Sequence, residues 1–286
     1  MLSSTFMKFW RTPVLVFLMM GVHPALTADA QESAAEYCRQ AQELLSQGKY
    51  QQAREAAQRA LQLDSRSAEA ESLIGTAEFA RGDLDLAQKH LQRALELQPG
   101  SIATRRTLGA TYLKKRRLKD ARQEFELVLA SHPDDFVSLY SVGLALLLDD
   151  RPADALKHFE KAHGLNPGDP TLLMSMLQAR LKLKQEVQAR ATLGELDQRL
   201  EPRDPRRVQL AALLVEQGYY ELAIPEFERL RTLDPDSYDL SYNLALAYHR
   251  ARKESEAASL IESLLARKEA AELHSLLAEV EGRRGN

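Results

Sequence analysis

The chain has 286 residues, of which 44% are hydrophobic and 28% charged, so it is long enough to bury a core and too apolar for an intrinsically disordered protein. Its formal net charge of -3 gives no indication of binding to nucleic acid or to an anionic membrane surface. Aromatic residues make up only 6%, and the abundance of Ala, Leu, Glu, Gln and Arg favours long amphipathic helices over β-sheets.

Residues 1–30 have the layout of a secretory signal peptide. Two basic residues precede an apolar run over residues 14–22, and small residues follow at Ala28 and Ala30. The run is about half of the ~20 residues that a membrane-spanning helix needs. We therefore expect an exported, periplasmic or envelope-associated protein whose signal peptide is cleaved near Ala30 and which keeps no membrane span. Cleavage after Ala28 and retention of the leader as an anchor are the alternatives.

Alanine recurs through the rest of the chain with a fixed period. The step from Ala53 to Ala87 is 34 residues, and the series continues in the same step to Ala257. Periods of 20 to 50 residues are typical of solenoid proteins. The recurring alanines are Ala53, Ala87, Ala121, Ala155, Ala189, Ala223 and Ala257.

Two further columns share this step. One contains small residues with a single exception at Leu177, which indicates a place where two helices cross closely. The other lies four residues after each recurring alanine and is mostly bulky and apolar, as expected for side chains that fill the space between one hairpin and the next. The small column contains Ala41, Gly75, Gly109, Gly143, Ala211 and Ala245. The bulky column contains Ala57, Leu91, Phe125, Phe159, Leu193, Phe227 and Ile261.

The third copy shows what this pattern resembles. Leu108-Gly109, Tyr112, Ala121, Phe125 and Pro133 are similar to the tetratricopeptide repeat, with its Leu-Gly-x2-Tyr, later Ala-x3-Phe and closing proline. The tryptophan that often opens that motif is missing. The resemblance implies an all-α fold, in which helical hairpins stack into a right-handed superhelical solenoid.

The period divides the chain into a solenoid over residues 34–286. Seven hairpins are expected at about 34–67, 68–101, 102–135, 136–169, 170–203, 204–237 and 238–270, with a C-terminal helix over 271–284. The fifth hairpin departs most from the pattern, because it has Leu177 in the small column, Arg180 at an apolar place and Glu201 where proline is usual. A degenerate structural copy and a bend in the solenoid are both open readings of it.

No set of residues for catalysis, for a metal or for a cofactor is evident. The histidines lack metal-ligand spacing on a helix face, and the glycines lie in packing or turn positions and form no phosphate-binding loop. Cys38 is the single cysteine and is expected to be a small, buried residue, with an intermolecular disulfide as the alternative. The basic run over residues 114–117 is expected to complement a helix C-terminus, since it lacks interleaved aromatic residues.

The resemblance also implies where a partner would bind, because first helices line the concave face in this family. Projected onto this sequence, that face gathers an apolar stripe able to take an extended peptide or an amphipathic helix. Arg106 and Lys114 flank the stripe on one side, and Tyr242, Asn243, His249 and Arg250 on the other. The stripe contains Leu113, Tyr140, Leu144, Leu147, Met174, Gln178 and Leu181.

These observations predict a non-catalytic protein-protein interaction scaffold of the cell envelope, and an assembly factor is one form that such a scaffold takes. Its partner is expected to be a protein or peptide of unknown identity, with no nucleic acid, small-molecule substrate or cofactor. Two other readings stay open: a structural solenoid that self-associates, and a cytoplasmic adaptor or co-chaperone whose leader has been misread. Some family members capture a C-terminal carboxylate with lysine and asparagine, but Cys38, Gln42 and Ser72 occupy the corresponding places here.

Overall fold

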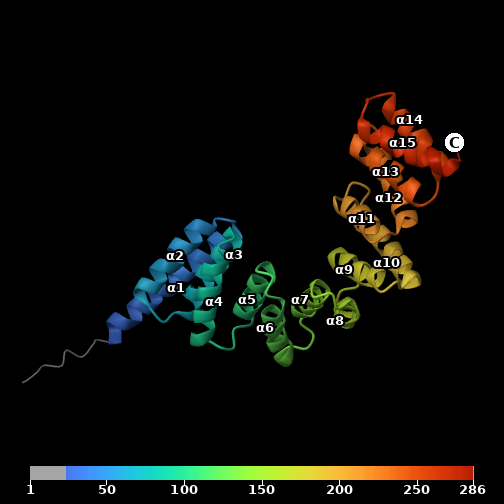
Figure 1. Cartoon of the computed structure of the whole chain (residues 1–286). Coiled ribbons are helices and arrows are strands. Elements are labelled where there is room, and N and C mark those ends of the chain that lie inside the picture. The colour runs from blue at the N-terminus through green and yellow to red at the C-terminus, as the bar shows by residue number, and fades with distance from the viewer. Residues whose placement is uncertain (1–23, 286) are drawn as a thin grey trace, which may run out of the picture. The chain divides into compact units, whose positions relative to one another are not determined.

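The computed structural model describes residues 24–285, which form α-helices joined by short turns and contain no β-strand (Figure 1). The predicted all-α repeat fold is thereby confirmed. The helices are α1 (Pro24–Ser46), α2 (Tyr50–Leu63), α3 (Ala68–Arg81), α4 (Leu84–Leu97), α5 (Ile102–Lys114), α6 (Leu118–Ser131), α7 (Phe136–Leu148), α8 (Pro152–Leu165), α9 (Pro170–Lys182), α10 (Glu186–Arg199), α11 (Arg206–Glu216), α12 (Tyr220–Leu233), α13 (Tyr238–Arg250), α14 (Glu254–Leu265) and α15 (Ala271–Arg284).

The chain divides after Pro99 into two compact units. The first contains α1–α4 and the second α5–α15. Consecutive helices pair into hairpins, from α1–α2 to α13–α14, and α15 packs against α13 and α14. None of the described helices is both long and apolar enough to cross a lipid bilayer.

One residue in every hairpin turn has left-handed backbone geometry. Glycine occupies this place at Gly48, Gly82 and Gly218. The remaining hairpins have a non-glycine residue there, at Arg116, Asp150, Lys184 and Arg252. In each turn the residue after this one donates its backbone N–H to a carbonyl five residues earlier, as in Arg117 N to Tyr112 O at 2.9 Å. This Schellman bond ends the first helix of each hairpin in the same way, whether or not glycine is present.

The small column lies against the bulky column of the same hairpin. A Cβ atom at Gly143 would lie 2.4 Å from a ring carbon of Phe159, and one at Gly109 would lie 2.8 Å from Phe125. Gly75 faces Leu91 in the same manner, at 2.6 Å. The expectation that the bulky residues fill the space between hairpins therefore needs correction, because each of these three packs on the glycine of its own hairpin.

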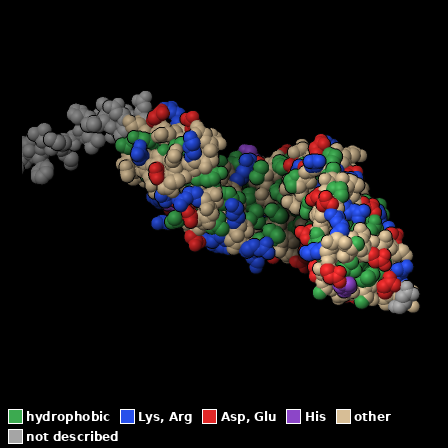
Figure 2. All heavy atoms as spheres, turned by 90° about the horizontal axis from the view of Figure 1, so that it is seen from above, with side chains coloured by type: hydrophobic (Ala, Val, Ile, Leu, Met, Phe, Trp, Pro, Cys, Tyr) green, Lys and Arg blue, Asp and Glu red, His purple; other side chains and the backbone are tan. Residues whose placement is uncertain are grey.

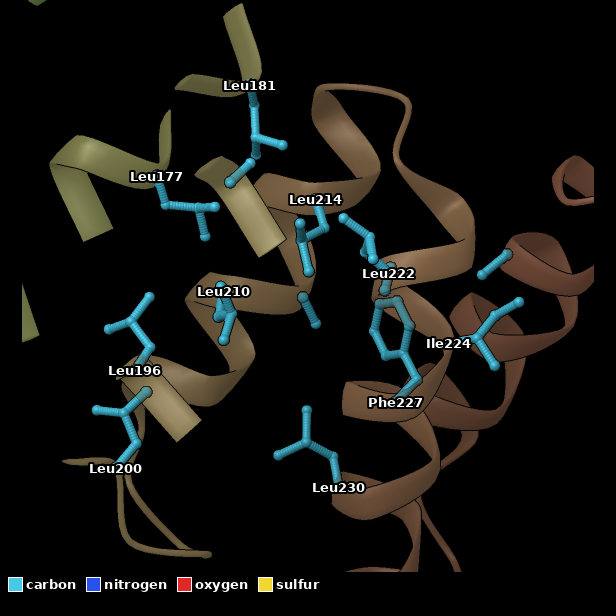
Figure 3. Close-up of a cluster of buried hydrophobic side chains, with 14 of the residues drawn as sticks. Leu177, Leu181, Leu196, Leu200, Leu210, Leu214, Leu222, Ile224, Phe227 and Leu230 are labelled. Carbon is cyan, nitrogen blue, oxygen red and sulfur yellow. The ribbon is translucent and has the colours of Figure 1, made fainter. Parts of the chain in front are cut away.

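The fifth hairpin forms two complete helices despite its unusual sequence. Leu177 is fully buried in a cluster that Leu193 also contacts, so leucine on both helices replaces the glycine–phenylalanine pair of the preceding hairpin. Arg180 donates hydrogen bonds to the Thr192 hydroxyl and, at 3.4 Å, to the carbonyl of Gln188. The cluster continues into the sixth hairpin, where Leu210 and Leu214 of α11 point into the space between α10 and α12 (Figure 3).

The junction between α10 and α11 differs from the other junctions of the second unit. The other first helices of hairpins in this unit, α5, α7, α9 and α13, start at a serine or aspartate whose side chain accepts a backbone N–H, such as Asp135 and Asp169. At α11 the preceding residue is Pro205, and no side chain caps the helix. The backbones of α10 and α11 also approach less closely than those of the other consecutive helices in this unit. A buried arginine connects the two helices instead.

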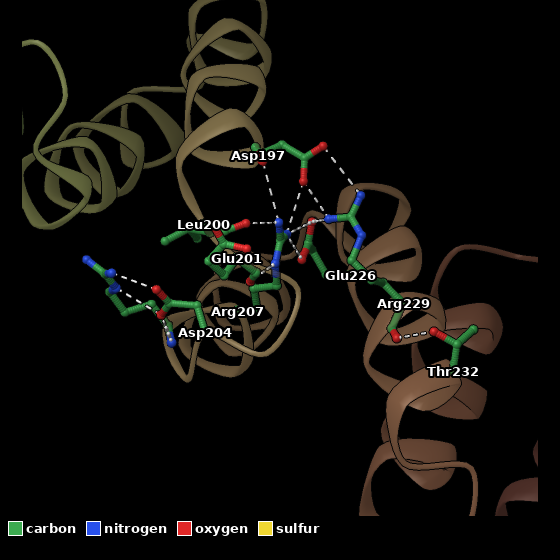
Figure 4. A network of polar contacts seen from close by, with 9 residues as sticks. Asp197, Leu200, Glu201, Asp204, Arg207, Glu226, Arg229 and Thr232 are labelled. Atoms are coloured by element: carbon green, nitrogen blue, oxygen red, sulfur yellow. Dashed lines mark hydrogen bonds and ion pairs between the residues drawn. The ribbon is translucent and has the colours of Figure 1, made fainter.

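Arg207 is that arginine, and it is 3% exposed (Figure 4). Its guanidinium donates to the carbonyls of Leu200 and Glu201 at 2.5 and 2.9 Å, which fixes the loop. It also contacts carboxylate oxygens of Asp197 and Glu226 at 3.0 and 3.1 Å. The pair has partly exposed equivalents earlier in the chain, where Arg105 and Glu124 lie 2.9 Å apart in the third hairpin.

The ends of the described chain bear on two expectations. Most of the predicted signal peptide lies outside the described residues, and α1 runs through the expected cleavage position at Ala30. At the other end α15 buries Leu273, Leu276 and Val280, and the exposed remainder of this helix is mostly polar.

Candidate functional site

The predicted stripe falls on three first helices of the second unit. Leu113 lies on α5, Tyr140, Leu144 and Leu147 on α7, and Met174, Gln178 and Leu181 on α9. Residues that hold the same place in successive hairpins belong to helices that touch, since α5 contacts α7 and α7 contacts α9. The repeat therefore brings positions 34 residues apart to one surface.

The structure separates this set into surface and interior residues. Leu113, Tyr140, Leu144, Met174 and Gln178 are half-buried, so part of each side chain faces outward. Leu147 and Leu181, at 3% and 2% exposed, are buried in the packing between helices. The last two consequently support the surface from below and offer no area to a partner.

Two exposed residues of α7 extend the surface. Val137 is 45% exposed and Leu148 is 38% exposed. With Tyr140 and Leu144 they follow the spacing i, i+3, i+7 and i+11, which places them along one helix face. We call these four residues the α7 stripe. The sequence carried this spacing, but the projection from the family pattern left out both ends of it.

The surface around the α7 stripe is mainly hydrophobic and carries charge at its edge. Figure 2 shows hydrophobic side chains gathered in a hollow over the part of the second unit that contains α7. The places equivalent to Leu148 carry Lys114 on α5 and Lys182 on α9. Lys182 forms an ion pair with Asp150 at 2.6 Å. The surface thus has an apolar centre and a basic rim, an arrangement common at protein interfaces.

Tyr140 is held in place by its surroundings. Its hydroxyl lies 3.3 Å from the Ser175 hydroxyl of α9, and its ring centroid lies 5.9 Å from that of Phe159. Ser175 in turn donates to the Thr171 carbonyl at 3.1 Å. A half-buried tyrosine that is ordered before binding loses little conformational entropy on contact with a partner.

The residues that flank the predicted stripe differ in how far they are exposed to a partner. Arg106 forms an ion pair with Asp135, and its guanidinium is partly exposed. On the other flank Tyr242 is half-buried, and Asn243 and Arg250 are exposed. His249, in contrast, is fully buried, and its Nδ1 lies 2.7 Å from a carboxylate oxygen of Glu254. It therefore connects α13 to α14 and is not presented to a partner.

Other chemistry is sparse in the described part of the chain. Among residues 24–285 no three His, Cys, Asp or Glu side chains gather in a way that could hold a metal ion. Cys38 is 2% exposed, and burial raises the pKa of its thiol, which makes the thiolate needed for disulfide exchange less accessible. In the basic run Arg117 pairs with Asp120 at 2.7 Å and lies over the ring of Tyr112.

Comparison of the sequence with family models gives matches to the tetratricopeptide repeat over most of the chain. One model matches residues 38–102, and a second matches residues 78–141, 146–214 and 214–280. No curated protein matches the sequence.

Solved structures give the same fold at low sequence identity. PilF of Pseudomonas aeruginosa is 21% identical with a TM-score of 0.61, and the match covers 79% of this chain and 99% of that one. A tetratricopeptide repeat protein from Parabacteroides merdae is 16% identical with a TM-score of 0.62, covering 87% and 99%. MamA from Desulfovibrio magneticus is 22% identical with a TM-score of 0.55, covering 58% and 94%. Likeness at this level of identity concerns the fold alone.

Proposed function

The chain belongs to the tetratricopeptide-repeat family, and from this premise we propose that it is a non-catalytic scaffold of the cell envelope that binds a partner protein on the α7 stripe. Repeat proteins of this family are generally protein-interaction scaffolds without catalytic activity. The observation that carries the proposal is the exposure of apolar side chains along one face of α7, which packing inside the second unit does not use.

The chemistry of the surface defines the kind of segment it takes. An apolar centre of about four side chains suits a segment that presents hydrophobic residues from one face of a helix or from alternate residues of a strand. Tyrosine is a frequent contact residue at interfaces, and Tyr140 is already ordered. An assembly factor, which holds one subunit until the next arrives, is a role that such a surface could serve.

Two substitutions on α7 test the binding surface. We expect Tyr140→Ala and Leu144→Asp to weaken capture of the partner from envelope extract roughly tenfold or more, because hot-spot aromatic and aliphatic side chains contribute about 2 kcal/mol each. Both residues are only half-buried, so helix content measured by circular dichroism should stay unchanged.

Val187 provides the control, because it is 80% exposed on α10 and lies outside the α7 stripe. Val187→Asp introduces the same charge as Leu144→Asp and should leave capture unaltered. If capture survives both α7 substitutions, the α7 stripe is not the binding site.

Export is proposed from the leader sequence. Two basic residues, the apolar run and the small residues near Ala30 support secretion. N-terminal sequencing of protein from native cells should give a chain that begins at Gln31. Ala34, which is buried in α1, lies after this cleavage site and stays in the cleaved chain. Recovery of the intact leader from the cytoplasm would contradict the proposal.

A further inference from the structure

Two clefts adjoin on the side of the second unit where the hairpins turn. One has a volume of about 640 Å³ and the other about 320 Å³. Both are lined by Glu186, Gly218 and Tyr219, so they form one continuous depression, which we call the turn-side trough. It adjoins the rim of the α7 stripe at Lys182, but none of the four α7 stripe residues lines it.

The length of the trough follows from the repeat. Its lining includes the left-handed residues of four consecutive hairpins, Asp150, Lys184, Gly218 and Arg252. Neighbouring packed helices lie about 8–10 Å apart, so three steps between these residues span roughly 25–30 Å. An extended polypeptide covers that distance in about eight residues.

The trough is lined by more basic than acidic side chains. Two of its basic residues have partners, since Lys182 pairs with Asp150 and Arg190 pairs with Glu186 at 2.7 Å. Within residues 24–285 the side chains of three others form no hydrogen bond or ion pair. These are Lys184, Arg250 and Arg252.

Two of these three basic residues occupy turn positions at which glycine would have less backbone strain. Lys184 and Arg252 have φ values of 57° and 61°, and the same turn position is glycine in three other hairpins. A side chain in left-handed geometry costs roughly 1–2 kcal/mol, which the adjacent helix C-terminus offsets in part by attracting a cation. The fold imposes this geometry on every hairpin, so the strain itself does not indicate a site, and the feature that bears on binding is that both positions hold a cation.

We propose that the turn-side trough binds an extended acidic segment of a partner protein. Carboxylates of the segment would pair with Lys184, Arg250 and Arg252, while Asp150, Glu186 and Glu221 in the lining can accept backbone N–H groups of the bound chain. A polypeptide supplies backbone N–H donors to these wall carboxylates, whereas the phosphates of a nucleic acid offer them no donor, which favours a polypeptide. Because the whole chain has a net charge of -3, a polyanion has no general attraction to it.

Fluorescence anisotropy with a fluorescein-labelled hexaglutamate peptide at low ionic strength tests this proposal. The full chain should bind the peptide, and its affinity should fall as salt is added. The double variant Lys184→Asn/Arg252→Asn should lose at least tenfold in affinity. Asparagine tolerates left-handed geometry, so these substitutions remove charge and leave the turns folded.

Matched controls keep the result specific to the trough. Lys119→Gln/Lys161→Gln removes two exposed cations from α6 and α8 and should change affinity by less than twofold. Tyr140→Ala should also leave hexaglutamate binding unchanged, so failure of the α7 stripe and failure of the trough can be told apart. The proposal is overturned if the full chain does not bind the peptide or if the asparagine variant binds equally well. Binding of a single-stranded oligothymidylate without binding of hexaglutamate would overturn it as well.

Discussion

Gly143→Ala is expected to lower the free energy of unfolding of the fourth hairpin by about 2 kcal/mol. The added methyl would lie 2.4 and 2.6 Å from two ring carbons of Phe159, which is fully buried and cannot swing outward. Alanine stabilises a helix by about 1 kcal/mol relative to glycine, but overpacking of a core costs about 1–3 kcal/mol or more. The closeness of this contact puts the cost at the upper end, so the clash outweighs the helix propensity.

The same substitution elsewhere should have the opposite sign. Gly194 lies in the middle of α10, and a Cβ there would meet no atom within 4 Å. Gly194→Ala is therefore expected to stabilise the chain by roughly 0.5–1 kcal/mol. Hydrogen exchange of the α7–α8 and α10 amides measures both effects locally, which matters because a repeat array need not unfold in one step.

The fifth hairpin suggests a compensated variant. There Leu177 and Leu193 occupy the places that Gly143 and Phe159 hold in the fourth hairpin. Gly143→Leu/Phe159→Leu should recover much of the stability that Gly143→Leu alone loses, because the volume removed from one helix makes room on the other. If Gly143→Ala instead slows hydrogen exchange in α7 and α8, the close approach of Gly143 to Phe159 does not limit the size of the residue at position 143.

Packing that repeats could be predicted from the sequence, whereas packing that occurs once could not. The small and bulky columns recur at a fixed step, so Gly143 and Phe159 were both identified before their contact was known. Their pairing within one hairpin depends on how the two helices cross, and the period does not contain that information. Likewise the projection of the family's concave face places Leu147 and Leu181 in the stripe, but burial by neighbouring helices decides whether a residue faces out.

Two further features left little recognisable trace in the sequence. Arg116, Asp150, Lys184 and Arg252 adopt left-handed geometry although none is glycine, because the fold imposes the same Schellman ending on every hairpin. Within the Arg207 network the Arg207–Glu226 pair repeats the places of Arg105 and Glu124, but Asp197 and the loop carbonyls have no counterpart in the period. The residues that the network joins come from two hairpins and an irregular loop, so only the folded chain brings them together.

Arg207→Ala is expected to cost the α10–α11 junction about 2–4 kcal/mol, because it leaves buried polar groups with fewer partners. The substitution removes one of the two arginines that contact Glu226, which is 4% exposed, and leaves the carbonyls of Leu200 and Glu201 without the Arg207 donor. Arg229 still lies 3.0 Å from Glu226, so the buried carboxylate keeps one cation and the cost stays below that of a fully unpaired buried charge. Hydrogen exchange at α10 and α11 and protease cleavage of the loop should both rise.

Two further variants test whether this loss of stability is specific to Arg207 or would follow the removal of any arginine. Arg105 holds the same place in the third hairpin, but its side chain is 22% exposed, so Arg105→Ala should cost only about 1 kcal/mol. Arg207→Met/Glu226→Met replaces the buried pair with apolar side chains and should recover most of the loss, since such exchanges are often close to neutral. A double variant as unstable as Arg207→Ala would mean that the loop carbonyls carry the effect.

Acid should open the same junction in the unsubstituted chain. Burial opposes ionisation of Asp197, but hydrogen bonds from Arg207 and Arg229 prevail and lower the pKa of its carboxyl group. A carboxyl whose pKa is lower in the folded state stabilises the fold above its unfolded pKa of about 4, and the stabilisation is lost as pH falls through the folded value. Exchange at α10 and α11 should thus rise below about pH 4, and in Arg207→Ala this acid response should shrink, because one of the two cations that favour the Asp197 carboxylate is gone. An equal acid response in both proteins would show that the junction depends on other carboxylates.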